Sequence, residues 1–150
     1  MRRGDERGPA LERFDRGAFD GALADVPCTC EGTVRKNADA LDDVGPAASR
    51  HIASLQRDIL ERAVALTRPG GTVVYSTCTF APEENEAVVD AVASAGGAEL
   101  RSFDVGLASA PGLTEFDGET YDPSLRKARR FYPHHNDTGG FFCAKLAVTA

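Results

Sequence analysis

The chain has 150 residues, with 23 acidic and 17 basic side chains and a formal net charge of −6. This length supports one hydrophobic core, so we expect a single domain. No apolar stretch approaches the roughly 20 residues of a membrane-spanning helix, and the first residues lack the apolar segment of a signal peptide. These features argue against a membrane protein and favour a cytoplasmic one.

Four cysteines are present, at positions 28, 30, 78 and 143. In a reducing compartment they are expected to be free thiols. Zinc is the weaker interpretation, because structural zinc usually takes four ligands from paired Cys or Cys/His motifs. Only Cys28 and Cys30 combined with His134 and His135 could supply such a set. We therefore expect no metal.

The first half of the chain predicts a strand followed by a helix. Residues 1–18 are charged and interrupted by Gly and Pro, and are expected to be irregular. Residues 20–26 favour a short buried strand. Apolar residues then recur every three or four positions across 47–67, which predicts an amphipathic helix. Gly70 and Gly71 are expected to end that helix.

A second strand and helix follow directly. Residues 72–77 are rich in β-branched and aromatic types, which favours a strand. Pro82 and the acidic run Glu83-Glu84-Asn85-Glu86 are interpreted as the start of a helix over 83–95. Alternating strands and helices predict an α/β fold with a right-handed crossover and a parallel sheet.

The last third of the chain has a different character. A short strand is expected over 98–103, followed by a long segment rich in Gly, Pro, Asp and Ser, whose length indicates a function. Residues 140–148 predict a final strand, which we expect to run antiparallel to a neighbour.

Two cysteines follow the two expected parallel strands. Cys28 comes after Pro27, and Cys78 comes after Thr77. The carboxyl ends of parallel strands meet at the edge where open α/β sheets bind ligands, so the two thiols should lie close together. A cysteine nucleophile also needs a neighbouring group that handles protons, and Asp25 is the nearest candidate. Buried core thiols are the alternative interpretation.

Basic residues cluster in two places in this acidic chain. Arg35 and Lys36 form the first pair, and the second cluster spans 126–130. Both are candidates for contacts with nucleic-acid phosphates, and a solvated basic surface is the alternative.

Taken together, these motifs resemble the RNA (cytosine-5)-methyltransferase family of the Nop/Sun type, from about Phe19 to Leu146. The resemblance is carried, in chain order, by Asp25-Val26-Pro27-Cys28-Thr29-Cys30, Gln56, Tyr75-Ser76-Thr77-Cys78-Thr79, Pro82-Glu83-Glu84-Asn85-Glu86, Arg130-Phe131-Tyr132-Pro133-His134 and Gly139-Gly140-Phe141-Phe142. It implies a Rossmann-like methyltransferase fold that uses S-adenosylmethionine. The reaction it implies is methylation of carbon 5 of cytidine in tRNA or rRNA through a covalent cysteine adduct.

The resemblance also implies roles for individual residues. Cys78 would add to carbon 6 of the base, Cys28 would help the methylated product leave, and Asp25 would hold the polar edge of the cytosine. Asp25, Pro27 and, more weakly, Asp5 would lie on the cofactor side. The implied RNA contacts are Arg35, Lys36, Arg129, Arg130 and His134.

Two departures from the family pattern shape the expectations. The usual Pro-Cys-Ser-Gly corner reads Pro-Cys-Thr-Cys, and the glycine-rich cofactor loop is not found before Asp25. We therefore expect residues 1–150 to be one partial catalytic domain, its carboxyl-terminal half. Alone, it should bind S-adenosylmethionine poorly and tend to associate through an unprotected strand at 19–26.

Two other functions remain open at this stage. A non-catalytic RNA-binding or partner subunit, or a truncated remnant, would need a separate chain that carries the cofactor-binding half. DNA cytosine methylation would instead use Cys28 as the nucleophile, and the intact Ser76-Thr77-Cys78 favours RNA.

Overall fold

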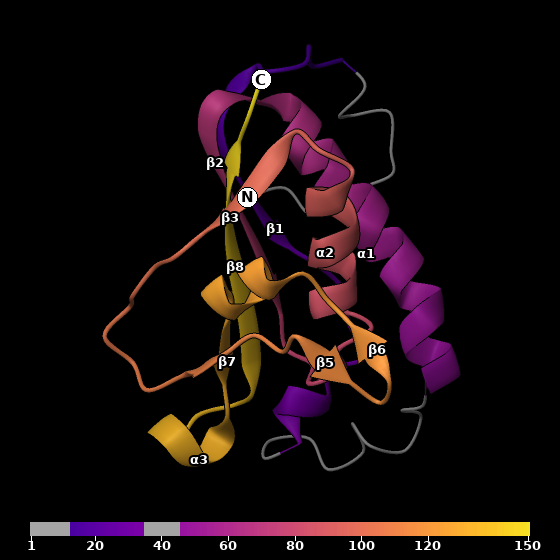
Figure 1. The fold of residues 1–150 in the computed structure, drawn as a ribbon, viewed down its shortest axis with the longest axis vertical. Coiled ribbons are helices and arrows are strands. Elements are labelled where there is room, and N and C mark those ends of the chain that lie inside the picture. The colour runs from indigo at the N-terminus through magenta and orange to yellow at the C-terminus, as the bar shows by residue number, and fades with distance from the viewer. Residues whose placement is uncertain (1–12, 35–45) are drawn as a thin grey trace.

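The computed structural model describes residues 13–34 and 46–150. Its longer elements are β1 (Phe19–Asp25), α1 (Pro46–Leu66), β2 (Thr67–Thr77), α2 (Glu86–Ser94), β3 (Ala98–Arg101) and β8 (Phe141–Val148). The shorter ones are η1 (Glu31–Thr33), β4 (Ala110–Pro111), β5 (Glu115–Phe116), β6 (Glu119–Thr120), η3 (Pro123–Lys127), β7 (Arg129–Phe131) and α3 (Pro133–Asn136). Helices α1 and α2 lie side by side and cover one face of the sheet (Figure 1).

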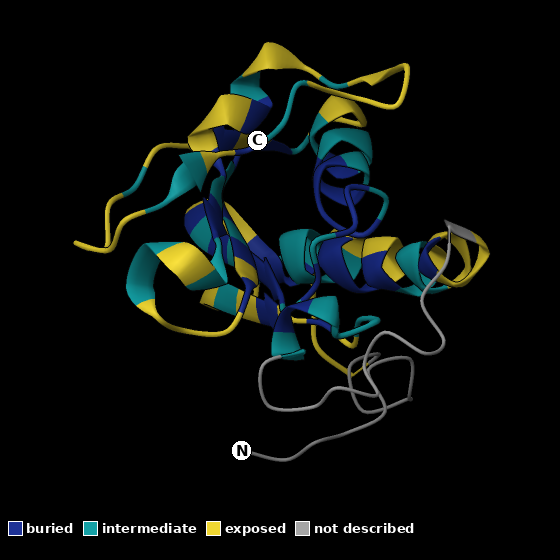
Figure 2. Ribbon diagram, turned by 90° about the horizontal axis from the view of Figure 1, so that it is seen from below, coloured by how far each residue is buried: buried dark blue, intermediate teal, exposed yellow. Residues whose placement is uncertain are grey.

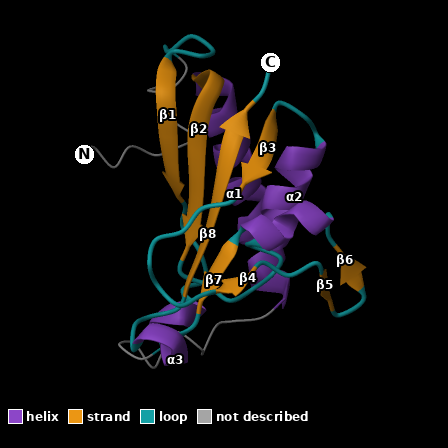
Figure 3. Cartoon of the chain, turned by 60° about the vertical axis from the view of Figure 1, so that its left-hand side comes forward, coloured by secondary structure: helices purple, strands orange, loops and turns teal. Residues whose placement is uncertain are grey.

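The main sheet has six strands, in the order β1-β2-β8-β7-β4, with β3 pairing with β8. Strands β1 and β2 are parallel, as the sequence predicts, and β8 runs antiparallel to β2. Strand β3 is also antiparallel to β8, so the parallel part of the sheet is confined to its first two strands. In the part of the chain that the structure describes, β1 forms an open edge of the sheet (Figure 3).

The core lies between the sheet and the two long helices. Inward-facing side chains of the central strands, among them Val73, Tyr75 and Phe142, are completely buried. Leu60 of α1 and Val89 of α2 close over them and are equally inaccessible. Figure 2 shows this as a buried zone that runs through the sheet and the adjoining sides of both helices. The core fixes the strands whose carboxyl ends carry the cysteines.

The two glycines after α1 do not end that helix. Helix α1 ends at Leu66, where the Thr67 hydroxyl donates to the carbonyl oxygen of Ala63 at 2.9 Å. Gly70 and Gly71 lie inside β2, next to a shift in the pairing register between β1 and β2. A Cβ on Gly71 would lie 2.5 Å from the carbonyl oxygen of Asp20, so glycine is required for this close approach of the strands.

Helix α2 begins three residues later than the sequence predicts. Its first helical residue is Glu86, and the preceding Pro82–Asn85 stretch forms a turn. Glu84 and Asn85 of the acidic run therefore lie buried in this turn, where Glu83 is half-buried, and Glu86 begins the helix. No helix in the described ranges is long and apolar enough to cross a membrane.

Candidate active site at the ends of β1 and β2

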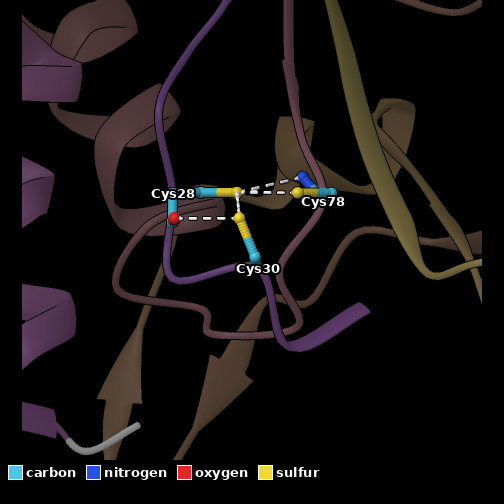
Figure 4. A group of neighbouring side chains, drawn as sticks. All are labelled: Cys28, Cys30 and Cys78. Atoms are coloured by element: carbon cyan, nitrogen blue, oxygen red, sulfur yellow. Dashed lines mark hydrogen bonds between the residues drawn. The ribbon is translucent and has the colours of Figure 1, made fainter. Parts of the chain in front are cut away.

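Cys28 and Cys78 lie together at the carboxyl ends of the parallel pair. The backbone pairing of β1 with β2 continues past Asp25, because the Val26 N–H donates to the Ser76 carbonyl oxygen at 3.1 Å. The Sγ atoms of Cys28 and Cys78 are 3.0 Å apart, and both side chains are half-buried (Figure 4). The predicted proximity of the two thiols is confirmed.

Asp25 and Pro27 lie on the open side of this pair. Asp25 is the last residue of β1 and is exposed, and its Oδ1 atom accepts a hydrogen bond from the Ser76 hydroxyl at 2.8 Å. Pro27 is also exposed. The carboxylate is therefore oriented by its strand neighbour and remains accessible at the edge of the sheet. Asp5 lies outside the described residues.

The surroundings of Cys28 favour its protonated form. The hydrogen bond with Cys78 and then burial raise the pKa of the Cys28 thiol well above its ordinary value. Cys28 is therefore a neutral thiol at physiological pH. Its S–H group can donate a hydrogen bond to the Cys78 sulfur, and this bond would stabilise a thiolate at Cys78.

Cys30 contributes a third thiol to the same place. Its Sγ atom is 3.8 Å from that of Cys28, and its thiol donates to the Cys28 carbonyl oxygen at 3.2 Å. Burial raises the pKa of this thiol as well. The backbone of Cys30 has a φ of 64°, in the left-handed region that favours glycine. In the family pattern that the sequence resembles, glycine is the usual residue at this position.

Glu84 and Gln56 fix the loop that carries Cys28. Glu84 is fully buried and accepts hydrogen bonds from the Thr29 backbone N–H at 3.1 Å and the Thr29 hydroxyl at 2.6 Å. The Gln56 amide donates to Glu84 at 3.0 Å and to the Pro27 carbonyl oxygen at 2.8 Å. This role of Glu84 is not evident from the sequence, because its partner Thr29 is 55 residues away.

Asn85 fixes the backbone on both sides of Cys78. Its Oδ1 atom accepts from the Thr77 hydroxyl at 2.6 Å, and its Nδ2 atom donates to the Thr79 carbonyl oxygen at 3.0 Å. In addition, the Gly32 N–H donates to the Cys78 carbonyl oxygen at 2.8 Å. Polar contacts therefore fix the backbone of both segments that carry Cys28 and Cys78. The positions of the two thiols are defined without a bound substrate.

The structure contradicts one of the predicted RNA contacts, Arg130. Its side chain is only 4% exposed, and it forms a two-point ion pair with the buried Glu86, at 2.7 and 2.5 Å. A third hydrogen bond joins Arg130 Nη1 to the Phe80 carbonyl oxygen at 3.0 Å. With these partners Arg130 anchors β7 to the loop after Cys78, so it is not available to a phosphate.

The other predicted RNA contacts differ in accessibility. Arg129 is half-buried and donates to the Ser109 hydroxyl at 2.9 Å, whereas His134 is exposed on α3. The His134 ring stacks on Tyr132, which in turn stacks on Phe80. Arg35 and Lys36 lie outside the described residues.

A groove runs beside this aromatic stack. It has a volume of about 450 Å³, and its lining includes Glu31, Phe80, Pro82, Leu113 and Tyr132. The groove thus adjoins both the loop after Cys78 and the segment that carries His134.

Comparison with known protein families gives a match over almost the whole chain. A family model described as 16S rRNA methyltransferase RsmB/F matches residues 2–147. The ribosomal RNA small subunit methyltransferase F of Klebsiella pneumoniae (strain 342) is 38% identical over 133 residues, which are 89% of this chain and 26% of that protein. The tRNA (cytosine(49)-C(5))-methyltransferase of Pyrococcus abyssi is 35% identical over 139 residues, 93% of this chain and 44% of that protein.

Solved structures agree with these matches. A methyltransferase homolog protein from Pyrococcus horikoshii has a TM-score of 0.75 and 33% identity, over 91% of this chain and 40% of that one. NSun6 from the same organism, solved with SFG, has a TM-score of 0.69 and 32% identity, over 85% of this chain and 29% of that one. The chain therefore spans less than half the length of each of these relatives.

Proposed function

The chain belongs to the 16S rRNA methyltransferase RsmB/F family, and we propose that it forms the nucleophile-bearing part of an enzyme that methylates carbon 5 of cytidine in rRNA or tRNA. The observation that carries the proposal is the 3.0 Å contact between the Cys28 and Cys78 sulfur atoms at the ends of paired parallel strands. The curated relatives that methylate RNA extend well beyond the matched region. The activity of the whole protein is therefore part of the proposal.

Cys78 is the proposed nucleophile. Carbon 5 of cytosine is a weak nucleophile, and a transient bond to carbon 6 overcomes this. The Cys78 thiolate adds to carbon 6, a sulfur–carbon bond forms, and the displaced π electrons enrich carbon 5. The base has to be unpaired or rotated out of its stack to reach the sulfur.

Cys28 and Asp25 assist this addition and its reversal. The polar edge of the cytosine hydrogen-bonds to the Asp25 carboxylate, which Ser76 orients. After methylation, a water molecule takes the proton from carbon 5, the electron pair of that C–H bond re-forms the double bond between carbons 5 and 6, and the bond between Cys78 and carbon 6 breaks with its electron pair returning to the Cys78 sulfur. Cys28 lies 3.0 Å from that sulfur and can donate a hydrogen bond to the departing thiolate.

The residues present fit one side of S-adenosylmethionine. Asp25 is an accessible carboxylate at the end of β1, and Pro27 lies exposed two residues further on. These two residues would hold part of the cofactor, whose bound form supplies an electrophilic methyl group. The remaining contacts are assigned to the cofactor-binding half, in the same protein or in a separate chain.

Covalent trapping tests the assignment of Cys78 without the cofactor. RNA that carries 5-azacytidine has a more electrophilic carbon 6, so we expect the chain to form an adduct that survives denaturing electrophoresis. Cys78→Ala should lose the adduct, whereas Cys28→Ala should retain it. Cys143→Ala is the matched control, because Cys143 lies on β8 away from the sulfur cluster.

Ordinary cytidine RNA then separates attack from release. With the cofactor and the cofactor-binding half supplied, Cys28→Ala should accumulate adduct, because its release is slowed. An adduct formed by Cys78→Ala and not by Cys28→Ala would reverse the two roles. Absence of any adduct with the unaltered protein would favour the non-catalytic partner subunit.

A further inference from the structure

Cys30 has no part in the proposed methylation, yet its sulfur points at the two thiols that do. The Sγ atoms of Cys28, Cys30 and Cys78 all lie within 4.8 Å of one another. Figure 4 shows the Cys28 sulfur facing both of the others, with Cys28 and Cys30 reaching in from the loop after β1 and Cys78 from the end of β2. This triad brings together three half-buried thiols from two segments of the chain.

The spacing of the triad suits a single metal ion. Zinc–sulfur bonds of about 2.3 Å place the sulfur atoms of one ion about 4 Å apart. The Cys28–Cys30 separation of 3.8 Å already has this value, and the Cys28–Cys78 separation of 3.0 Å has to open by about 1 Å. Such a change is within the reach of a side-chain rotation, because all three sulfur atoms project from loops or a strand end.

We propose that Cys28, Cys30 and Cys78 form a three-thiolate site for a soft d10 cation, with Zn²⁺ as the type ion. Thiolate sulfur prefers such ions, and an all-sulfur donor set excludes Mg²⁺ and Ca²⁺. On binding, each thiol that becomes a ligand releases its proton to solvent as its sulfur–metal bond forms. The site differs from the pattern that the sequence suggested, because Cys78 takes the place of His134 and His135.

One backbone N–H beside the triad can stabilise a metal-bound thiolate. The Cys78 backbone N–H donates to the Cys28 sulfur at 3.3 Å, a contact that stabilises negative charge on a metal-bound thiolate. The nearby carboxylates of Glu31 and Glu84 already accept hydrogen bonds from Thr79 and Thr29, respectively. The fourth position on the ion is therefore left to water or an added ligand.

Occupation of the triad would make Cys78 unavailable to a base. This consequence rests on the proposed function, whereas metal binding itself does not. Cys30 would thus allow a metal ion to block the nucleophile reversibly. In the family pattern that the sequence resembles, glycine stands at this position and supplies no thiol.

Titration of the full chain with Cd²⁺ tests the site directly. Cadmium–thiolate bonds absorb in the ultraviolet, and we expect saturation at one ion per chain, with Zn²⁺ competing for it. Cys30→Gly is the most informative variant, because the backbone φ of 64° at this position suits glycine and the variant should keep its fold. Its affinity for Cd²⁺ should fall by about a hundredfold or more, and Cys143→Ala should bind as the unaltered chain does.

The outcomes are distinct from those of the adduct test. Equal Cd²⁺ affinity in Cys30→Gly and the unaltered chain, with both folded by circular dichroism, would overturn the proposal. Loss of binding in Cys143→Ala would do the same. Bound Zn²⁺ should also slow alkylation of Cys78 by iodoacetamide in the unaltered chain, a readout that needs neither RNA nor cofactor.

Discussion

Glu86 and Arg130 are charged residues that the fold places inside the protein. Both side chains are almost fully buried, and the pair makes two parallel hydrogen bonds. Glu86 Oε1 also accepts from the Leu113 backbone N–H at 2.9 Å. A buried pair of this kind need not exceed an apolar pair in stability, but removing one partner leaves the other charge without compensation.

We expect Glu86→Gln to lower the free energy of unfolding by about 3 kcal/mol, because the Arg130 guanidinium would remain buried without a counter-charge. Urea denaturation of the purified chain measures this. The matched control is Glu61→Gln, which breaks the exposed Arg57–Glu61 pair and should cost no more than about 0.5 kcal/mol. Similar losses in both variants would show that the buried pair does not hold β7 in place.

Strand β1 exposes apolar surface and, among residues 13–34 and 46–150, is an edge strand of the sheet. Leu23 is 65% exposed and Phe19 is 39% exposed, and β1 pairs with β2 along one side. Natural edge strands usually carry charges or bulges that prevent pairing with other chains. The bulge near Gly21 protects the start of β1, while its second half, which ends at Asp25, has regular pairing.

We expect the chain to self-associate through β1 and Leu23→Lys to reduce this association, because a charge on the edge strand opposes pairing. Sedimentation velocity over a range of concentrations measures the change. Leu107→Lys introduces the same charge at a residue of similar exposure outside the sheet, and should leave association unchanged. Equal effects of both substitutions would assign the association to net charge alone.

For the molecule as a whole, a net charge of −6 coexists with an exposed basic pair on η3. Arg126 and Lys127 are both exposed, at the end of η3 and close in sequence to β7. Phosphate binding depends on local charge, because salt screens interactions beyond about 10 Å at ordinary ionic strength. The overall acidity of the chain therefore does not argue against an RNA-binding surface at Arg126 and Lys127.

We expect replacement of Arg126 and Lys127 by Gln to weaken RNA binding similarly across RNA sequences. The slope of log affinity against log salt should fall by about 0.7 for each phosphate that the protein no longer neutralises. Fluorescence anisotropy with single-stranded RNA at several salt concentrations measures both effects. Replacing Arg57 and Arg101, which are exposed elsewhere, removes the same charge and should change the slope less. Identical slopes in the two double variants would contradict a specific basic surface.

Local sequence patterns were sufficient to predict the main elements and the meeting of the two thiols. Helix α1 and strands β1, β2 and β8 follow from apolar periodicity and β-branched composition, which act within a few residues. The proximity of Cys28 and Cys78 required one more rule, namely that parallel strands joined by a crossover end at the same edge. The antiparallel β8 was predicted and is confirmed. The roles of the site residues stay predictions.

Only the tertiary structure shows which polar residues are buried. Arg130 was predicted to be a surface cation and Glu84 to begin a helix, and both are buried with partners 44 and 55 residues away. Gly71 was expected to end a helix, but it permits close approach of β1 to β2. The Cys30 sulfur likewise lies beside Cys28 and Cys78 because of how the loop after β1 packs against the end of β2. A charge becomes internal only where a distant partner compensates its desolvation, and local sequence does not show that partner.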